Sequence, residues 1–579
     1  MTSERGSGKR KASLEGNLKI KTMNGALHEH AVGDRHPPSH PPAISSPKNE
    51  DETDEERSAW LPLNGDYPNR NAFPCTNSKT ASFFSPAWNK EVRLLLELAI
   101  PTLLLTLGNF VPMVVTASYI GRVYGAVYLD GFQLASLTAN LFSLSILTGL
   151  YSAADTLGPQ AIGAGNLKEA GLVAMRGFLG SMIVVIPICA GLAVYMQDIL
   201  LWLHQDVEAS LYASQWYLVF IAFVPFYALY MVTWKFLSAQ HVMMPLLIGT
   251  GVSVTLVLPL AMQYCTRWMG FLGSALALVL FNMAQAFVTL GDLYIFQRHI
   301  PETWPGLSAW REALQWEPLL AYFSLGMGGI VAMSEWIYWE AMTLAIGTLG
   351  VVPLSVHAIT IQVVTTMFMG PMSLAIALSI RIASTLPQNV EHAKQLAIGT
   401  MIAGTLLFGT LAWVLYLVQE FVFHIFTSEE DVLAQCRAIW WHVCHYFLHL
   451  SVYVLFTGIA TGLGMQWTLG LVTFVALWFF GLPTAYFFGI YQAGTLEATW
   501  FWYAPPYIAM NVVLLSIFVT TDWHKISQQV REREGMDDDD DKPLVHASNG
   551  PTIMGTAFDH AENGTMDSTL ANEQTSLLG

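Results

Sequence analysis

The stretch Ser334-Glu335-Trp336-Ile337-Tyr338-Trp339-Glu340 places two carboxylates and three aromatic rings inside an apolar run from about residue 318 to residue 349. A carboxylate at the centre of a membrane-spanning helix costs about 3 kcal/mol on insertion scales, so two in one helix indicate a function. Glu335 and Glu340 are therefore candidate residues for proton or cation coupling. Five positions along an ideal helix turn their side chains about 140° apart. We expect one acid to face a central cavity and the other to lie in a hydrogen-bonded layer behind it.

The composition of the chain is that of an integral membrane protein. It has 579 residues, of which 53% are hydrophobic and only 12% are charged, whereas a soluble chain carries about twice that charged fraction. The formal net charge is −16, and an acidic chain lacks the basic surface that binding of nucleic acid requires. The five cysteines are odd in number and irregularly spaced, which predicts neither a disulfide framework nor a metal site.

Twelve apolar runs between about residues 93 and 520 are each close to or above the length needed to cross a bilayer, about 20 residues. Positively charged residues gather in the loops of one side, which places both termini in the cytoplasm. We expect an all-α integral membrane protein with five regions: a disordered tail (1–88), a first lobe of six helices (89–300), a cytoplasmic linker (301–317), a second lobe of six helices (318–521) and a disordered acidic tail (522–579).

The two halves of the apolar region repeat with a period of about 225 residues. The segment Gly125-Ala126-Val127-Tyr128-Leu129 corresponds to Gly350-Val351-Val352-Pro353-Leu354, and each follows a long apolar run. Because each half contains six spans, both halves start on the same side of the membrane. Repeats of this parallel kind are related by an axis along the membrane normal, and their substrate site lies near the bilayer midplane.

Four short segments of the apolar region, in a fixed order, also match the pattern of a known family. They are Leu157 to Asn166 with its flanking residues 155–156 and 167–168, Thr303-Trp304-Pro305-Gly306 with Ser308 and Trp316, Glu335-Trp336 with Glu340, and Pro371 through Ser379-Ile380-Arg381. Together they resemble the multidrug and toxin extrusion (MATE) transporters of eukaryotes, over about residues 90–520. The resemblance implies a V-shaped bundle of two six-helix lobes that exchanges a cation for an organic substrate.

The resemblance also implies roles for individual residues. It places Glu335, Glu340 and Asn140 at positions that resemble functional ones in the family. This chain departs from the animal members at two positions where they carry a glutamate. Gln362 stands at the first, in the eighth span, and His449 lies beside the second, in the tenth. Asn140, Gln362 and His449 are therefore candidate residues of the substrate cavity.

Other residues of the spans have both a functional and an ordinary interpretation. Trp336 either offers an aromatic face to an organic cation or packs against lipid or protein. Asn109 lies at about the repeat equivalent of Glu335, and it either lines the cavity or forms an interhelical hydrogen bond. His445 and His449 are one helical turn apart. This spacing suits metal ligands or a proton relay, but it also suits hydrogen bonding within the bundle.

We expect a secondary antiporter that exports organic compounds, above all organic cations and xenobiotics, in exchange for protons. Sodium is the alternative coupling ion, and no cofactor is expected. The alternatives are an exporter of lipid-linked or organic-anion cargo with the same fold, or a polytopic membrane enzyme. No catalytic constellation with suitable spacing and no phosphate-binding loop is found in the sequence, so we expect no enzymatic activity.

The expected partners are a small organic substrate and the lipid bilayer, with no nucleic acid, and we expect a monomer. Near the end of the chain, Glu573 precedes Leu577 and Leu578 in the form of a sorting signal that an adaptor protein would bind. We therefore expect a multi-pass protein of the plasma membrane or of a vacuolar or endosomal membrane, with both termini in the cytoplasm.

Overall fold

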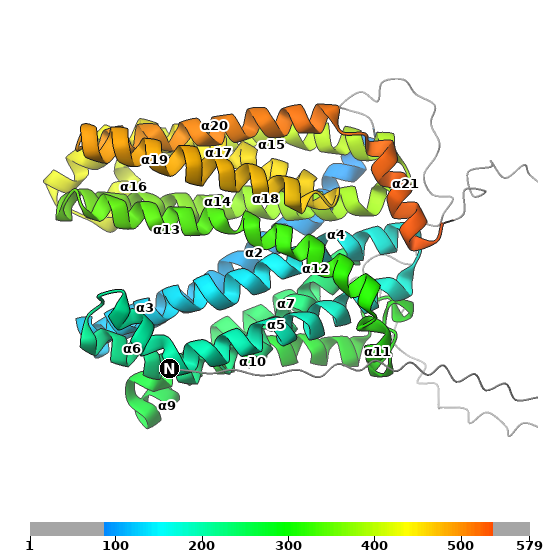
Figure 1. Cartoon of the computed structure of the whole chain (residues 1–579), viewed down its shortest axis with the longest axis horizontal. Helices are drawn as coiled ribbons and strands as arrows, with labels where there is room; N and C mark the ends of the chain where they lie inside the picture. Colours follow the sequence, from blue (N-terminus) through cyan, green and yellow to red (C-terminus); the bar gives the residue numbers. More distant parts are fainter. Residues whose placement is uncertain (1–85, 537–579) are drawn as a thin grey trace, which may run out of the picture. The chain divides into compact units, whose positions relative to one another are not determined.

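The computed structural model describes residues 86–536, and these residues fold into a bundle of long helices (Figure 1). The first half consists of α2 (Pro86–Val123), α3 (Ala126–Ala139), the π-helical η1 (Asn140–Leu144), α4 (Ser145–Ala164), α5 (Leu167–Trp202), α6 (Val207–Phe220), α7 (Phe223–Ala239), α8 (Met244–Val252), the π-helical η2 (Ser253–Val257), α9 (Leu258–Met269), the 3-10 helix η3 (Gly270–Leu272) and α10 (Gly273–Phe296).

Short elements connect this half to the second: the 3-10 helices η4 (Pro301–Thr303) and η5 (Leu307–Ala309) and α11 (Trp310–Ala313). The second half consists of α12 (Trp316–Ala332), α13 (Ser334–Gly347), α14 (Val351–Thr385), α15 (Val390–Leu417), α16 (Gln419–Phe426), α17 (Glu430–Gly462), α18 (Gln466–Phe474), the π-helical η6 (Val475–Gly481), α19 (Leu482–Thr484), the π-helical η7 (Ala485–Gln492), α20 (Leu496–Thr520) and α21 (Trp523–Glu534). The prediction of an all-α membrane protein is confirmed.

Ten helical segments of the described residues are long and apolar enough to cross a membrane, and α6 with α7, which meet at a bend of 53°, make an eleventh. One of the ten, Met244–Phe296, has 53 residues, far more than the ~20 that one crossing needs. It turns at Gly270, whose φ is +60°, and α9 and α10 pack against each other. Dividing this segment at the turn gives twelve crossings, which is consistent with the prediction.

The internal repeat is visible in the backbone. Gly125 (φ +95°) and Gly350 (φ +114°) stand directly before α3 and α14, in a conformation that a side chain would strain. In each half the following span, α5 or α15, begins with an asparagine cap. Asn166 before α5 and Asn389 before α15 each accept a hydrogen bond from a backbone N–H three residues later. The repeated sequence pattern therefore corresponds to repeated local structure.

One helix of each half lies at the centre of its packing. α4 contacts α5 and α7, and α14 contacts α13, α15 and α17. In Figure 1, the helices of residues 351–520 lie together, apart from α5, α7 and α10. The two halves meet where α4 packs against α12, α14 and α17, and α2 also packs against α14. We call the packing of α4 against the second half the lobe contact.

The lobe contact is held by side chains that bond to backbone carbonyls of the opposite half. Thr156 donates to the oxygen of Thr461 at 2.5 Å, and Gln160 donates to the oxygen of Gly462 at 3.0 Å. In the reverse direction, the side-chain amide of Gln388 in the second half donates to the backbone oxygen of Gly163 at 2.8 Å. The backbones approach so closely that a Cβ on Gly163 would lie 2.1 Å from the Ser384 oxygen. A larger residue at position 163 is therefore incompatible with this contact.

The prediction that the C-terminal tail is disordered from residue 522 is wrong for residues 523–534, which form α21. Asp522 caps this helix, because its carboxylate accepts hydrogen bonds from the next backbone N–H groups, at residues 524 and 525. Trp523 and Val530 lie on one face and are 2% and 3% exposed. The segment is too polar to look like a span, but burial of this face orders it. Residues 1–85 and 537–579, including Glu573, Leu577 and Leu578, lie outside the described part of the chain.

α21 contacts both halves of the molecule. Ser527 donates to the backbone oxygen of Leu386, in the second half, at 2.9 Å. In the first half, the Oε1 of Gln160 accepts a hydrogen bond from Arg533 at 2.8 Å. The buried Glu534 accepts a bond from the side chain of the α5 cap, Asn166, at 3.1 Å. Burial raises the pKa of Glu534, although the adjacent guanidinium opposes the shift. α21 therefore ties the two halves together beside the lobe contact.

Candidate functional site

Glu335 lies in the first turn of α13 and faces the interior of the second half, where it is 6% exposed. Tyr507 of α20 donates its hydroxyl to Oε1 of Glu335 at 2.8 Å. Trp339, one helical turn after Glu335, donates its indole N–H to the same hydroxyl at 3.0 Å. Among residues 86–536, no Lys, Arg or His forms an ion pair with Glu335, and its partner is a neutral hydroxyl. A buried carboxylate without a cationic partner is suited to carry a proton.

Aromatic side chains of α17 and α20 enclose this carboxylate. The rings of Tyr446 and Tyr453 meet the ring of Tyr507 edge-on, with centroids 5.1 and 5.6 Å away. Two further hydroxyls, those of Tyr338 and Tyr503, are buried and have no hydrogen-bond partner in the described structure. Buried hydroxyls are normally bonded to protein or to water. The surroundings of Glu335 are therefore mostly apolar, but they contain hydroxyl groups that have no hydrogen-bond partner in the described structure.

Glu340 does not share this environment. Its side chain is exposed, as is that of Trp336, which lies one turn earlier on the same face of α13. Trp336 is 37% exposed, and its ring packs edge-on against Phe368 of α14, with centroids 5.7 Å apart. No bend or bulge lies between Glu335 and Glu340, because α13 is regular there. As the helical spacing predicts, the two acids face different surroundings and cannot share one proton.

The first half contains a neutral counterpart of the Glu335 site. Gln285 of α10 donates from Nε2 to Oδ1 of Asn109 at 2.7 Å and to the Thr250 hydroxyl at 2.9 Å. Tyr230 of α7 bonds to the same hydroxyl at 2.8 Å. Asn109 thus forms an interhelical hydrogen bond, the ordinary role of an amide in a membrane helix. Since Asn109 is the approximate repeat equivalent of Glu335, the two halves differ in charge: one has a carboxylate, the other amides.

The remaining predicted cavity residues are dispersed. Asn140 is exposed and begins η1, a π-helical turn in the second span of the first half, and such turns are frequent at functional sites. Gln362 is half-buried on α14. His449 on α17 is also half-buried, and its Nε2 lies 3.2 Å from Nε2 of His445. Of the seven predicted residues, α13 brings Glu335, Trp336 and Glu340 within two turns of helix, whereas the others lie on four other elements.

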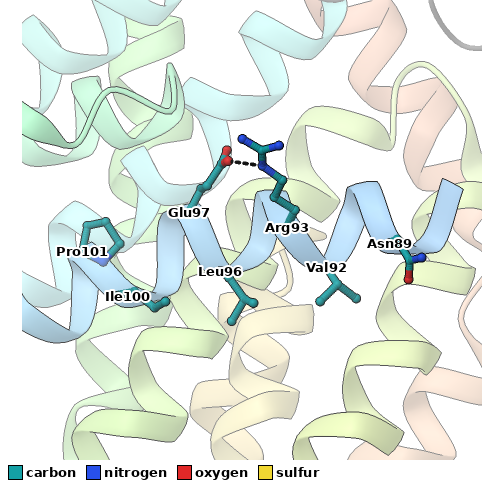
Figure 2. Close-up of a pocket in the computed structure, with 7 residues that line it drawn as sticks. All are labelled: Asn89, Val92, Arg93, Leu96, Glu97, Ile100 and Pro101. Carbon is teal, nitrogen blue, oxygen red and sulfur yellow. Dashed lines mark hydrogen bonds and ion pairs between the residues drawn. The ribbon is translucent and has the colours of Figure 1, made fainter. Parts of the chain in front are cut away.

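A hollow of about 490 Å³ lies outside this site, on the surface of α2 (Figure 2). It is lined by residues of that helix alone, between Asn89 and Pro101, and the ion pair of Arg93 with Glu97 lies at its rim. None of the predicted site residues lines it. A hollow bounded by one helix face cannot enclose a ligand, so we assign it no function.

Sequence reasoning missed two polar partners of the spans. Tyr507 was not singled out, although it stands one turn after another tyrosine in a helix otherwise rich in apolar residues. Asp155 pairs with Lys235 of α7 at 2.8 Å, a partner that its neighbours in the sequence do not indicate. Neither partner could be found from local spacing, because each is distant in sequence from the residue that it contacts.

Outside the spans, one other acid has a clear electrostatic environment. The guanidinium of Arg437 donates two hydrogen bonds to Glu420 of α16, at 2.7 and 3.0 Å. These bonds lower the pKa of Glu420. The exposed acid is therefore held as a carboxylate.

Comparison with known proteins gives three concordant results. The family model described as MatE matches residues 99–263 and 329–487. The chain is 30% identical over 405 residues to multidrug and toxin extrusion protein 1 of Mus musculus, covering 69% of this chain and 70% of that protein. It is 29% identical over 455 residues to the protein of the same name from Oryctolagus cuniculus, covering 77% and 78%. The crystal structure of the eukaryotic MATE transporter AtDTX14 matches with a TM-score of 0.70 at 22% identity, over 77% of this chain and 99% of that one.

The two matched blocks correspond to the two structural halves. The first block runs from within α2 into α9, and the second runs from the end of α12 into η7. Each block thus contains one of the two polar sites, Asn109 with Thr250 in the first and Glu335 in the second. The blocks together span more than half of the chain, and the structure shares the fold of a solved member. The chain belongs to the multidrug and toxin extrusion (MATE) family of membrane transporters.

Proposed function

We propose that this transporter is an antiporter that exports organic compounds in exchange for protons, and that Glu335 carries the proton. The observation that carries the proposal is the buried Glu335 carboxylate, whose bonded partner is the neutral hydroxyl of Tyr507. Hard metal cations bind through several oxygen ligands. A carboxylate with one bonded hydroxyl is therefore better suited to carry a proton than to bind a sodium ion. The amides at Asn109 offer no equivalent titratable group in the first half.

Protonation would act by changing the charge at the centre of the second half. A hydrogen bond to a carboxylate is about twice as strong as one between neutral groups. The Tyr507 bond therefore weakens when Glu335 becomes a neutral acid, and α13 is held less firmly against α20. A local charge change of this kind shifts the balance between two conformations of a bistable protein. Proton uptake and release would thus alternate the side to which the substrate site opens.

The cargo that we propose is an organic cation or a related xenobiotic. Glu340 and Trp336 are exposed on one face of α13, where a carboxylate and an aromatic ring would both attract a cation. The names of the mouse and rabbit relatives, multidrug and toxin extrusion protein 1, agree with cargo of this class. Asn140, Gln362 and His449 would complete the cavity in another conformation. An organic anion or a lipid-linked molecule is the alternative cargo.

We further propose that α21 and both termini lie in the cytoplasm and that the transporter acts as a monomer. Lys168, Arg298, Arg311 and Lys394 lie in or beside the loops of this end of the molecule, and positive charge favours the cytoplasmic side. The membrane would be the plasma membrane or that of a vacuole or endosome. An adaptor protein would bind the sorting signal formed by Glu573, Leu577 and Leu578.

The test is uptake of a fluorescent organic cation into proteoliposomes under an imposed pH gradient without sodium. Wild type is compared with Glu335→Gln and Glu340→Gln, and with Glu208→Gln as a control, because Glu208 is an exposed acid outside α13. We expect gradient-driven uptake to fall at least tenfold in Glu335→Gln and to be unchanged in the control. Uptake that requires sodium would show that sodium, not the proton, is the coupling ion. Uptake of organic anions alone would overturn the proposed cargo.

A further inference from the structure

Three histidines form a row along one face of α17. His442, His445 and His449 are spaced by three and four positions, and residues at this spacing lie on the same side of a helix. All three are half-buried. α17 and α20 both begin at the end of the molecule opposite α21, which we call the far end (Figure 1). Ionisable side chains inside a membrane helix are rare, and proton relays are among the sites that they mark.

Each end of the row has a close polar contact. Nε2 of His442 lies 3.9 Å from Oε1 of Glu497, an exposed acid at the beginning of α20. Nε2 of His445 lies 3.2 Å from Nε2 of His449, and the two rings are edge-on with centroids 4.6 Å apart. Two nitrogens at that distance share one proton, so one ring donates and the other accepts. The row thus has an exposed carboxylate at one end and a hydrogen-bonded imidazole pair at the other.

The inner end of the row lies close to the Glu335 site. Asn511 of α20 donates to the backbone oxygen of His449 at 2.9 Å, and its own Oδ1 is buried without a hydrogen-bond partner in residues 86–536. Tyr507, which bonds to Glu335, stands one turn before Asn511 on the same helix. The unpaired oxygen of Asn511 therefore offers an acceptor between the imidazole pair and the Tyr507 hydroxyl.

The distance from Glu497 to Tyr507 along α20 is about half the thickness of a membrane. Glu497 and Tyr507 are ten positions apart on α20, which at about 1.5 Å per residue is about 15 Å. The hydrocarbon core of a bilayer is about 30 Å thick. A path from Glu497 through the histidines thus reaches from one membrane surface to the midplane, where the substrate site of a repeat-built transporter lies.

We propose that His442, His445 and His449 form a proton relay that connects the solution at the far end with Glu335. The relay rests on the proposed proton coupling and extends it by naming the route. A proton from the solution binds His442 beside Glu497 and passes to His445. Nε2 of His445 then gives it to Nε2 of His449, which releases its Nδ1 proton to a water bound at the Asn511 oxygen. The Tyr507 hydroxyl accepts a proton from that water and at the same time gives its own hydrogen to the Glu335 carboxylate. Each imidazole returns to its neutral form after the transfer.

The other titratable groups around α17 leave this route open. On α20 they are the Tyr503 and Tyr507 hydroxyls, beside Glu497 at its start. On α14, the ring of His357 lies against Tyr503 rather than against the row. On α15, Tyr416 packs on Trp441, whose ring in turn stacks on His445. On α17 itself, Arg437 is paired with Glu430 and with Glu420 of α16, and Asp431 is exposed near its start.

The test separates proton delivery from transport itself. His442→Gln and His445→Gln are reconstituted in proteoliposomes, with His424→Gln as a control, because the side chain of His424 on α16 bonds to the backbone of that same helix. One assay measures uptake of an organic cation driven by a pH gradient, over a range of pH at the far end. The second measures exchange of labelled for unlabelled substrate at equal pH, which requires no net proton movement.

The relay predicts that both variants lose at least fivefold in gradient-driven uptake and flatten its dependence on pH at the far end. Substrate exchange should stay within twofold of wild type, which also shows that the variants are folded. Equal loss in both assays would assign the histidines a structural role and overturn the relay, as would unchanged gradient-driven uptake. Wild type that transports without regard to the pH gradient would instead overturn the proposed coupling, and the relay with it.

Discussion

Replacing Tyr507 by Phe tests the central hydrogen bond of the proposed coupling site. The substitution keeps the ring, which packs against Tyr446 and Tyr453. It removes the hydroxyl that donates to Glu335 at 2.8 Å and accepts from Trp339 at 3.0 Å. The change is therefore confined to one oxygen atom inside the second half.

The expected size of the effect follows from the difference between two hydrogen bonds. A bond to a charged group contributes about 1.5–3 kcal/mol, and one between neutral groups about 0.5–1.5 kcal/mol. Loss of the Tyr507 hydroxyl thus disfavours the carboxylate form of Glu335 by about 1 kcal/mol more than the protonated form. Because one pH unit corresponds to about 1.36 kcal/mol, we expect the midpoint of pH-dependent transport to move to higher pH by about 0.7 unit.

The assay is gradient-driven uptake of an organic cation in proteoliposomes, measured at closely spaced pH values. Tyr503→Phe is the matched control, because its hydroxyl is buried four positions earlier on α20 but has no hydrogen-bond partner in the described structure. It should leave the midpoint in place. A midpoint that moves to lower pH in Tyr507→Phe, or one that moves equally in both variants, would refute the assignment of Glu335 as the coupling acid.

Three further predictions concern other parts of the molecule. Asn109→Leu should lower the free energy of unfolding by about 1 kcal/mol, because Gln285 loses one of its two acceptors and keeps Thr250. The pH profile of transport should be unchanged. Thermal unfolding in detergent measures the first effect, and a shifted profile would contradict the second. Gly163→Val should separate the lobes at their contact, which spin-label distances across it would report as longer than in wild type. Since burial raises the pKa of Glu534, burying its charged form opposes docking of α21, so docking should strengthen as pH falls. Amide exchange of α21, corrected for intrinsic rates, should then slow at low pH, and Glu534→Gln should abolish that dependence; exchange that slows equally in the variant would contradict it.

Much of the fold was predictable because a bilayer admits few backbone arrangements. Backbone groups in lipid must be satisfied within the segment, so long apolar runs become helices, and the repeat appeared at Gly125 and Gly350, where positive φ restricts the residue type. α21 escaped prediction for the opposite reason. Its composition is polar, and what orders it is burial of Trp523 and Val530 against elements that are distant in sequence.

The candidate site was predictable only as far as one helix determines it. The divergence of Glu335 and Glu340 follows from helical geometry alone, and the structure agrees with it. The partner of Glu335 is 172 positions away, and the partner of Asn109 is 176 positions away. No local spacing encodes such pairs, since they depend on how the spans are arranged. Among the many tyrosines of this chain, nothing in the sequence distinguished Tyr507.

The lobe contact has a consequence for the work that each transport cycle requires. Three of its hydrogen bonds, from Thr156, from Gln160 and to Gly163, join neutral side chains to backbone carbonyls, and water can replace each partner when the halves separate. Each such bond contributes about 1 kcal/mol net, so the three together contribute about 3 kcal/mol. One proton that moves down a gradient of two pH units releases about 2.7 kcal/mol. The contribution of these three bonds is thus of the same order as the free energy that one proton supplies, and polar bonds that water can replace allow the contact to form again in each cycle.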